Sequence, residues 1–184
     1  MPISVLIAEV MLLIAIQEST YARNGQGLAS PPGDRSQSLL IGSFILTLLA
    51  CLLTLVTGRG GAPSLAAFGI GQGVFFLGWA GRMAAIRQLG RFFTGHVSVA
   101  DDQTVIQSGL YRVIRHPGYL GAVFELAGCC MVAGSWLGWL CLLAGYLPAL
   151  VYRIRIEETA LVTRFGEAYR AYQVRTWRLF PFAF

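Results

Sequence analysis

Long apolar stretches recur along this chain and are separated by short polar segments. A helix needs about 20 mainly apolar residues to cross the hydrocarbon layer of a membrane. We therefore predict an all-α integral membrane protein with about five transmembrane helices. Their expected ranges are 2–16 with a few flanking residues, 39–56, 63–85, 117–132 and 136–152. The first stretch has neither the basic start nor the small-residue cleavage site of a signal peptide, so we interpret it as a helix.

The polar segments between these helices differ in length. Residues 24–37 are rich in Gly and Pro, which predicts an irregular loop. A tight turn near Gly134 and Ser135 would join the last two helices into a hairpin. Residues 91–115 form the one long polar connection, in which we expect short extended pieces. The fifth helix runs directly into a charged segment at 153–158, and an amphipathic, aromatic tail follows.

Composition supports a membrane protein. The chain has 184 residues, of which 55% are hydrophobic and 12% are charged. A soluble domain carries about twice that share of charged residues. The basic residues are all Arg and none is Lys, which is typical of a GC-rich bacterial genome and suggests a bacterial inner membrane. The net charge of +5 does not indicate a nucleic-acid partner, because the arginines lie beside hydrophobic spans.

The distribution of arginines predicts an orientation. With the N-terminus outside, one face of the membrane receives Arg59, and the other receives the arginines that flank the remaining loops and the tail. Positive residues concentrate on the cytoplasmic side. We therefore expect a multi-pass protein whose long polar connection and C-terminal tail share the cytoplasmic side.

Two sequence features resemble sites but are better explained by packing. Residues 69–73 contain three alternating glycines, yet the strand that precedes a dinucleotide-binding loop is missing. Gly69 and Gly73 instead have the spacing that lets membrane helices approach closely. The four cysteines lie in apolar spans without the spacing of metal ligands. We interpret them as small core residues and predict neither a metal nor a disulfide.

The most distinctive polar stretch is residues 108–121, which joins a polar connection to an apolar helix. It holds five large polar side chains, namely Tyr111, Arg112, Arg115, His116 and Tyr119. Charged groups next to lipid are costly, so a cluster of this kind usually marks a site. The alternative is a positively charged anchor at the membrane surface. An anchor explains the arginines but not a His-Pro pair flanked by tyrosines.

A second polar group follows the fifth helix and contains Arg153, Arg155, Glu157 and Glu158. Arg153 and Glu157 are four residues apart and share a helix face. They could form a surface ion pair worth only a few tenths of a kcal/mol. Arg153 nevertheless comes directly after a membrane span, where water is scarce and a charge needs a partner. The residues alone leave both interpretations open.

These two groups together resemble a known family, the isoprenylcysteine carboxyl methyltransferases. The first block reads Gly109-x-Tyr111-x-x-x-Arg115-His116-Pro117-x-Tyr119-x-Gly121. The second reads Arg153-x-x-x-Glu157-Glu158-x-x-Leu161-x-x-x-Phe165-Gly166-x-x-Tyr169-x-x-Tyr172, with a Leu179-x-Pro181 ending. The resemblance covers about residues 93–182. Its wider superfamily includes phospholipid N-methyltransferases and sterol reductases that use NADPH.

The resemblance implies a membrane methyltransferase that uses S-adenosylmethionine without a Rossmann domain. Residues 1–184 would form one membrane domain, in which 1–90 supply three spans and 91–184 the catalytic region, with a cytosolic cofactor-binding loop and a C-terminal helix. Arg153 would bind the carboxylate of the acceptor, and Glu157 would act beside it as a catalytic carboxylate. Cofactor contacts carry over to Ser98, Gln103, Thr104, Val105, Ile106, Tyr111, His116, Pro117, Gly118, Tyr119 and Glu157.

The chemistry of carboxyl methylation suits these residue types. An ionised carboxylate needs no base to attack a sulfonium methyl group, so the protein mainly aligns the reactants. The planar fork of Arg153 can hold a carboxylate with two hydrogen bonds. We expect a lipophilic, prenylcysteine-like or isoprenoid-like acceptor that enters from the bilayer. The alternatives are a lipid-amine N-methyltransferase with Glu157 as base, a reductase that binds NADPH, and a packing protein without a ligand.

Overall fold

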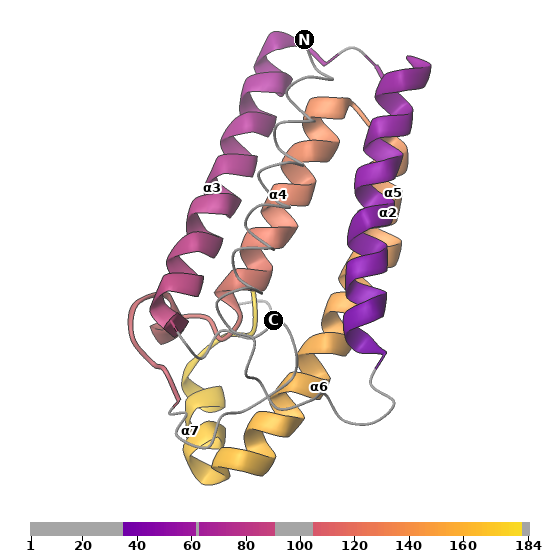
Figure 1. Ribbon diagram of the computed structural model, residues 1–184. Coiled ribbons are helices and arrows are strands. Elements are labelled where there is room, and N and C mark those ends of the chain that lie inside the picture. The colour runs from indigo at the N-terminus through magenta and orange to yellow at the C-terminus, as the bar shows by residue number, and fades with distance from the viewer. Residues whose placement is uncertain (1–34, 62, 91–104, 182–184) are drawn as a thin grey trace.

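The computed structural model describes residues 35–61, 63–90 and 105–181, which form a helical bundle without a strand among them (Figure 1). The first predicted helix and the N-terminal orientation lie outside these residues. The elements are α2 (Ser36–Thr57), α3 (Leu65–Leu89), the 3-10 turn η2 (Gly109–Arg112), α4 (Pro117–Ala133), α5 (Trp136–Cys141), the π turn η3 (Leu142–Tyr146), α6 (Leu147–Phe165) and α7 (Glu167–Arg175).

Two helices among the described residues are long and apolar enough to cross a membrane. They are α2 and the continuous helix Trp136–Phe165, which comprises α5, η3 and α6. Helix α4 is apolar but shorter. Helix α3 is long, but its glycines and its polar Gln72 and Arg82 dilute its apolar content. The described residues therefore confirm an all-helical fold, whereas the predicted number of five transmembrane helices is not confirmed.

Helices α3 and α4 approach closely because glycines face one another at two levels. A Cβ atom on Gly78 would lie 2.5 Å from the carbonyl oxygen of Gly121, and one on Gly128 would lie 2.7 Å from that of Gly71. The predicted pair, Gly69 and Gly73, is not part of this contact, since a Cβ atom there would meet nothing within 4 Å. The small residues that pack here are seven apart on each helix rather than four.

An ion pair links the same two helices. Arg82 Nη1 lies 2.8 Å from Glu125 Oε2, and Glu125 is fully buried (0% exposed). A buried charge is tolerated when an opposite charge and hydrogen bonds replace its hydration. Arg82, which the sequence placed near the end of a span, is thus a contact between helices.

The turn between α4 and α5 matches its prediction. Gly134 ends α4 with a φ of 57°, a left-handed conformation that glycine adopts at little cost. Ser135 then accepts a hydrogen bond from the main-chain nitrogen of Gly138 at 2.9 Å, which caps α5. The resulting hairpin packs against α2. Cys51, Cys129 and Cys130 are buried in this core, where the Cys51 thiol donates to Cys130 Sγ at 3.7 Å.

Candidate functional site

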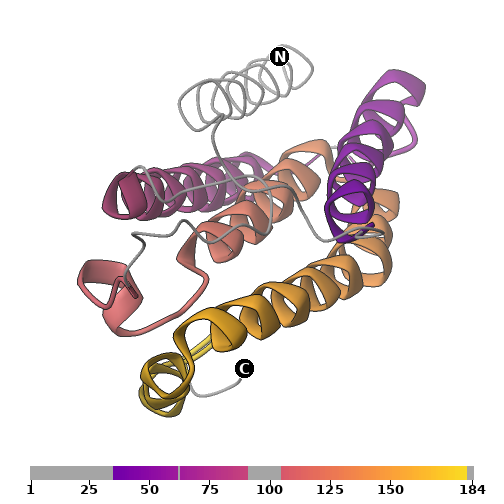
Figure 2. The same ribbon diagram turned by 60° about the horizontal axis from the view of Figure 1, so that its bottom comes forward.

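Hydrogen bonds and ion pairs join polar side chains from α2, α4, α6 and the C-terminal segment at one end of the bundle. In Figure 1 this is the lower end, where α2 and α4 begin and the charged last turns of α6 emerge. Figure 2 brings this end forward and shows α7 beside the end of α6. The two polar groups of the sequence therefore meet, as expected, although about forty residues separate them.

The C-terminal segment holds the start of α4 in place. Residues Ile114 and Trp177 form a parallel bridge. The main-chain nitrogen of Arg115 donates to the carbonyl of Trp177 at 2.7 Å, and that of His116 donates to the carbonyl of Arg178 at 3.1 Å. Pro117 then begins α4, a position where the missing N–H costs nothing. The His-Pro pair is thus fixed between a helix and a paired strand-like segment.

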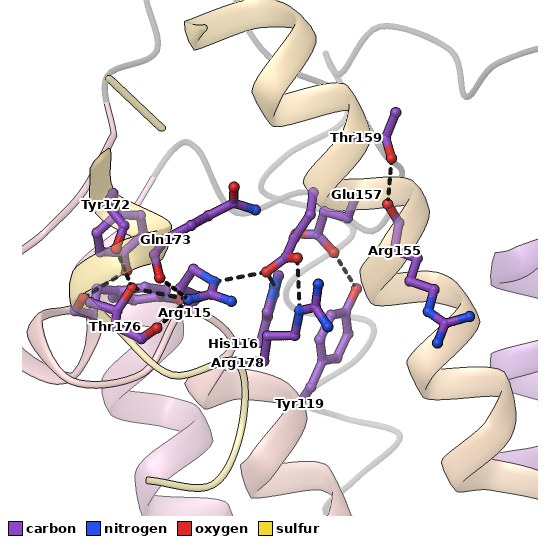
Figure 3. Close-up of polar contacts among 12 residues, drawn as sticks. Arg115, His116, Tyr119, Arg155, Glu157, Thr159, Tyr172, Gln173, Thr176 and Arg178 are labelled. Carbon is purple, nitrogen blue, oxygen red and sulfur yellow. Dashed lines mark hydrogen bonds and ion pairs between the residues drawn. The ribbon is translucent and has the colours of Figure 1, made fainter. Parts of the chain in front are cut away.

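Glu158 is the centre of the first polar cluster, which we call the Glu158 cluster. Figure 3 labels its partners Arg115, His116 and Arg178. Its Oε1 accepts from Arg115 Nε at 2.7 Å and lies 3.4 Å from His116 Nε2, while its Oε2 accepts from Arg178 Nε at 2.9 Å. Glu158 is 4% exposed and lies beyond the apolar part of α6. Burial raises the pKa of its carboxyl, but hydrogen bonds from His116 and Arg115 outweigh burial and lower it to about 2.

Arg115 also ties the cluster to α7. Its Nη1 donates to the main-chain oxygen of Gln173 at 3.0 Å and to that of Thr176. A guanidinium at the end of a helix satisfies carbonyls that have no partner within the helix. The hydroxyl of Tyr172 donates to the carbonyl of Tyr111 at 2.6 Å, and burial raises the pKa of Tyr172 to about 12, which keeps it a donor. Arg115 is therefore a structural residue in this arrangement.

A second chain of hydrogen bonds, the Arg153 chain, crosses three helices. Arg153 Nη1 donates to Ser36 Oγ on α2 at 3.0 Å, and Arg153 Nε donates to the Tyr119 hydroxyl on α4 at 3.4 Å. That hydroxyl donates in turn to Glu157 Oε2 at 2.8 Å. Arg153 is buried at 2% exposure, whereas Glu157 is half-buried. The Tyr119 hydroxyl thus connects the predicted arginine to the predicted carboxylate.

The rings of His116 and Tyr119 connect the two networks. They stack with centroids 5.7 Å apart and an interplanar angle of 26°. His116 contacts Glu158 and Tyr119 contacts Glu157, so two adjacent carboxylates on α6 contact two side chains at the start of α4. Arg155, which follows Arg153 by two residues, is exposed and points away from both networks (Figure 3).

The structure brings together part of the predicted site. Arg153, Glu157, His116 and Tyr119 converge, with Pro117 and Gly118 in the turn between the two rings. Tyr111, in η2, is buried against the end of α3, where its hydroxyl donates to the carbonyl of Ala85 at 3.5 Å. Val105 and Ile106 are half-buried and belong to neither a helix nor a strand. Ser98, Gln103 and Thr104 lie outside the described residues.

Sequence reasoning missed three contributors. It named Glu158 without giving it a role, although Glu158 receives three basic side chains. It placed Arg178 only among the tail arginines, and it left Ser36 in a loop. The sequence did offer a signal for Glu158, namely a carboxylate with possible basic partners in the first polar group and in the tail. No local pattern marks Ser36, because its partner is 117 residues away in the chain.

Comparisons with known proteins agree with these motifs. The model of the isoprenylcysteine carboxyl methyltransferase (ICMT) family matches residues 71–163. Protein-S-isoprenylcysteine O-methyltransferase of Schizosaccharomyces pombe is 30% identical over 104 residues, which are 55% of this chain and 44% of that protein. The Tribolium castaneum protein of that name is 31% identical over 118 residues, 61% of this chain and 41% of that protein.

A solved structure shares the fold. It is that of the eukaryotic intramembrane Ras methyltransferase ICMT, with a TM-score of 0.57 and 24% sequence identity. The match covers 83% of this chain and 54% of that one. The chain thus spans about half the length of the relatives that it matches.

Proposed function

Because this chain belongs to the isoprenylcysteine carboxyl methyltransferase family, we propose that it transfers a methyl group from S-adenosylmethionine to the carboxylate of a lipophilic acceptor. The acceptor class is an isoprenylcysteine or a similar isoprenoid acid. The observation that carries this proposal is the buried guanidinium of Arg153, held beside Tyr119 and Glu157 where apolar helices end.

The polar groups of the site fit the proposed cofactor. Glu157 offers a half-buried carboxylate that could pair with an ammonium group, and the stacked rings of His116 and Tyr119 offer aromatic faces to a cation. When bound, S-adenosylmethionine supplies an electrophilic methyl group on a sulfonium whose sulfur leaves as a neutral thioether. The segment that includes Ser98, Gln103 and Thr104 remains part of the proposed cofactor loop.

Arg153 would orient the acceptor. Its fork can present two N–H groups to a carboxylate, which fixes the plane in which the attacking oxygen lies. An anion and a cation neutralise each other during this reaction, so a site with little water favours the transition state. No proton is released from a carboxylate acceptor, and alignment by Arg153 is the main contribution of the protein.

We also propose that the protein lies in a membrane with this site at the cytoplasmic face. Two described helices have the length and composition of membrane spans, and the similar solved structure is described as intramembrane. The arginine distribution supports the cytoplasmic placement and an N-terminus outside. A bacterial inner membrane remains our proposal from the absence of Lys.

The test measures base-labile methyl ester formed from radiolabelled S-adenosylmethionine and a farnesylated N-acetylcysteine in mild detergent. Arg153→Ala should reduce the rate at least a hundredfold, because the acceptor carboxylate loses its positioning. Arg155→Ala is the matched control, since Arg155 is on the same helix but points away from the site. Equal rates in the two variants, or no ester with folded wild-type protein, would contradict the proposal.

A further inference from the structure

Arg153 can act as a carboxylate clamp only if its own side chain is held. It is 2% exposed, so hydrogen bonds within the protein must replace the hydration of its charge. The side chain has several rotatable bonds, and its planar group keeps one orientation only when more than one nitrogen is fixed. The residues that fix it therefore determine how an acceptor carboxylate would be presented.

Two of the three nitrogens of this guanidinium contact different helices. Tyr119 on α4 accepts from Nε at 3.4 Å, and Ser36 on α2 accepts from Nη1 at 3.0 Å. The Ser36 contact is the shorter of the two. Ser36 is fully buried (0% exposed), so water does not compete for its hydroxyl. Together these contacts fix both the position and the plane of the guanidinium.

Helix α2 is well placed to carry such a residue. Ser36 is its first residue, and the helix packs against α4 and the continuous helix α5–α6. The ring of Phe44 packs edge-on against Tyr146 at 5.9 Å, and Thr54 Oγ1 lies 2.7 Å from Ser135 Oγ. These contacts set α2 against the continuous helix that bears Arg153.

We infer that Ser36 is a positioning residue for the methyl acceptor and acts through Arg153. The inference rests on the proposed function, because it takes Arg153 as the residue that binds the acceptor carboxylate. Loss of the Ser36 hydroxyl would let the guanidinium sample more orientations, and the carboxylate would align with the methyl donor less often. The effect belongs to the acceptor alone, so affinity for S-adenosylhomocysteine stays unchanged.

The test is a double-mutant cycle on kcat/KM for the farnesylated N-acetylcysteine. Ser36→Ala should lower this value about tenfold, as expected when a hydrogen bond to a charged group is lost. In an Arg153→Lys background the same change should cost less than about twofold, because lysine lacks the planar fork that Ser36 orients. Calorimetry with S-adenosylhomocysteine and the melting temperature are measured for every variant.

Two further variants serve as controls. Thr47→Val removes another fully buried hydroxyl from α2, one that donates to the carbonyl of Ser43 at 2.9 Å, and it should leave the kinetics unchanged. Ser36→Cys keeps the shape of the side chain but replaces the oxygen with a weak acceptor. It should reproduce the loss seen in Ser36→Ala, and it keeps the test decisive if Ser36→Ala does not fold.

A loss that disappears in the Arg153→Lys background, with unchanged S-adenosylhomocysteine affinity, would support the inference. Equal losses in both backgrounds, a loss shared by Thr47→Val, or wild-type kinetics in Ser36→Cys would overturn it and leave methyl transfer intact. If wild-type protein forms no ester from S-adenosylmethionine, the proposed function fails, and this inference fails with it.

Discussion

Neutralising Glu158 should lower the stability of the protein far more than neutralising an exposed carboxylate does, because Glu158 holds the polar end of the bundle together. Glu158→Gln keeps the size of the side chain and removes its charge. That charge is shared by Arg115, His116 and Arg178, which come from the start of α4 and from the C-terminal segment. The substitution therefore weakens one buried group that connects α4, α6 and the tail.

The magnitude follows from the pKa of this carboxyl. A group whose pKa falls from 4.5 in the unfolded chain to about 2 in the folded protein stabilises the fold by about 3 kcal/mol at neutral pH. Removing one partner of a buried ion pair typically costs about 3 to 5 kcal/mol. Both routes lead us to expect a loss of about 3 kcal/mol or more in the free energy of unfolding.

The sign of the pH dependence follows from the direction of the shift. Because the folded-state pKa is the lower one, the stabilisation is fully present above about pH 5 and is lost as the pH falls toward 2. The stability difference between wild type and Glu158→Gln should thus be largest at neutral pH. It should narrow steadily between about pH 5 and pH 2.

Thermal unfolding in an uncharged detergent, followed by circular dichroism at several pH values, measures this difference. Glu167→Gln is the matched control, because Glu167 pairs with Arg170 at 2.9 Å but its side chain is 86% exposed. Exposed pairs contribute less than about 1 kcal/mol, so this variant should melt close to wild type. If Glu158→Gln melts like Glu167→Gln, or if its deficit does not change with pH, the assigned role of Glu158 is wrong.

Two other predictions concern the acceptor and the helix packing. Glu157→Gln should only weaken carboxylate methylation but nearly abolish methylation of an amine, because an amine must lose a proton to a base. Assays with prenylcysteine and with phospholipid acceptors distinguish these outcomes. Unchanged rates on both acceptors would refute a role for Glu157. Gly78→Ala should lower the stability by about 1 to 3 kcal/mol, because its Cβ atom would lie 2.5 Å from a main-chain oxygen. Gly73→Ala, which meets nothing within 4 Å, should be nearly neutral in the same thermal scan, and an equal loss in both would contradict the observed helix contact.

Much of the fold could be predicted from apolar periodicity and from helix punctuation. The predicted spans 39–56 and 117–132 lie within three residues of α2 and α4 at each end. Pro117 and Gly134 mark the ends of α4, because proline starts a helix readily and glycine accepts the left-handed conformation that terminates one. The fifth span was predicted to end at Tyr152, yet the helix continues to Phe165 as a charged segment that hydrophobicity alone does not reveal.

The glycine contact shows where a motif misleads. A four-residue glycine spacing is typical of close membrane helix pairs, and Gly69 and Gly73 have it. Which glycines face a neighbour depends on the rotation of the helix about its axis, and that rotation is set by the partner. Here Gly71 and Gly78 face α4, whose own Gly128 and Gly121 stand opposite them. A spacing within one helix cannot specify this choice.

The same limit applies to the carboxylates of α6. Successive residues of a helix point about 100° apart, so Glu157 and Glu158 must reach different partners. Glu157 contacts Tyr119, and Glu158 contacts Arg115 and Arg178. The motif marks both residues as important but cannot say which of them faces the proposed cofactor site.

The family match itself does not delimit the candidate site. Its residues, 71–163, include Arg153 and Tyr119 but neither the tail that carries Arg178 nor the helix that carries Ser36. Yet the hydrogen bond from Arg153 to Ser36 on α2, at 3.0 Å, is shorter than its hydrogen bond to Tyr119 on α4, at 3.4 Å. On the proposed function, a guanidinium that is oriented from outside the matched segment would present the methyl acceptor differently in relatives whose first helices differ. If Arg153 binds the methyl acceptor as proposed, acceptor selectivity in this family should therefore vary with the helix that precedes the match.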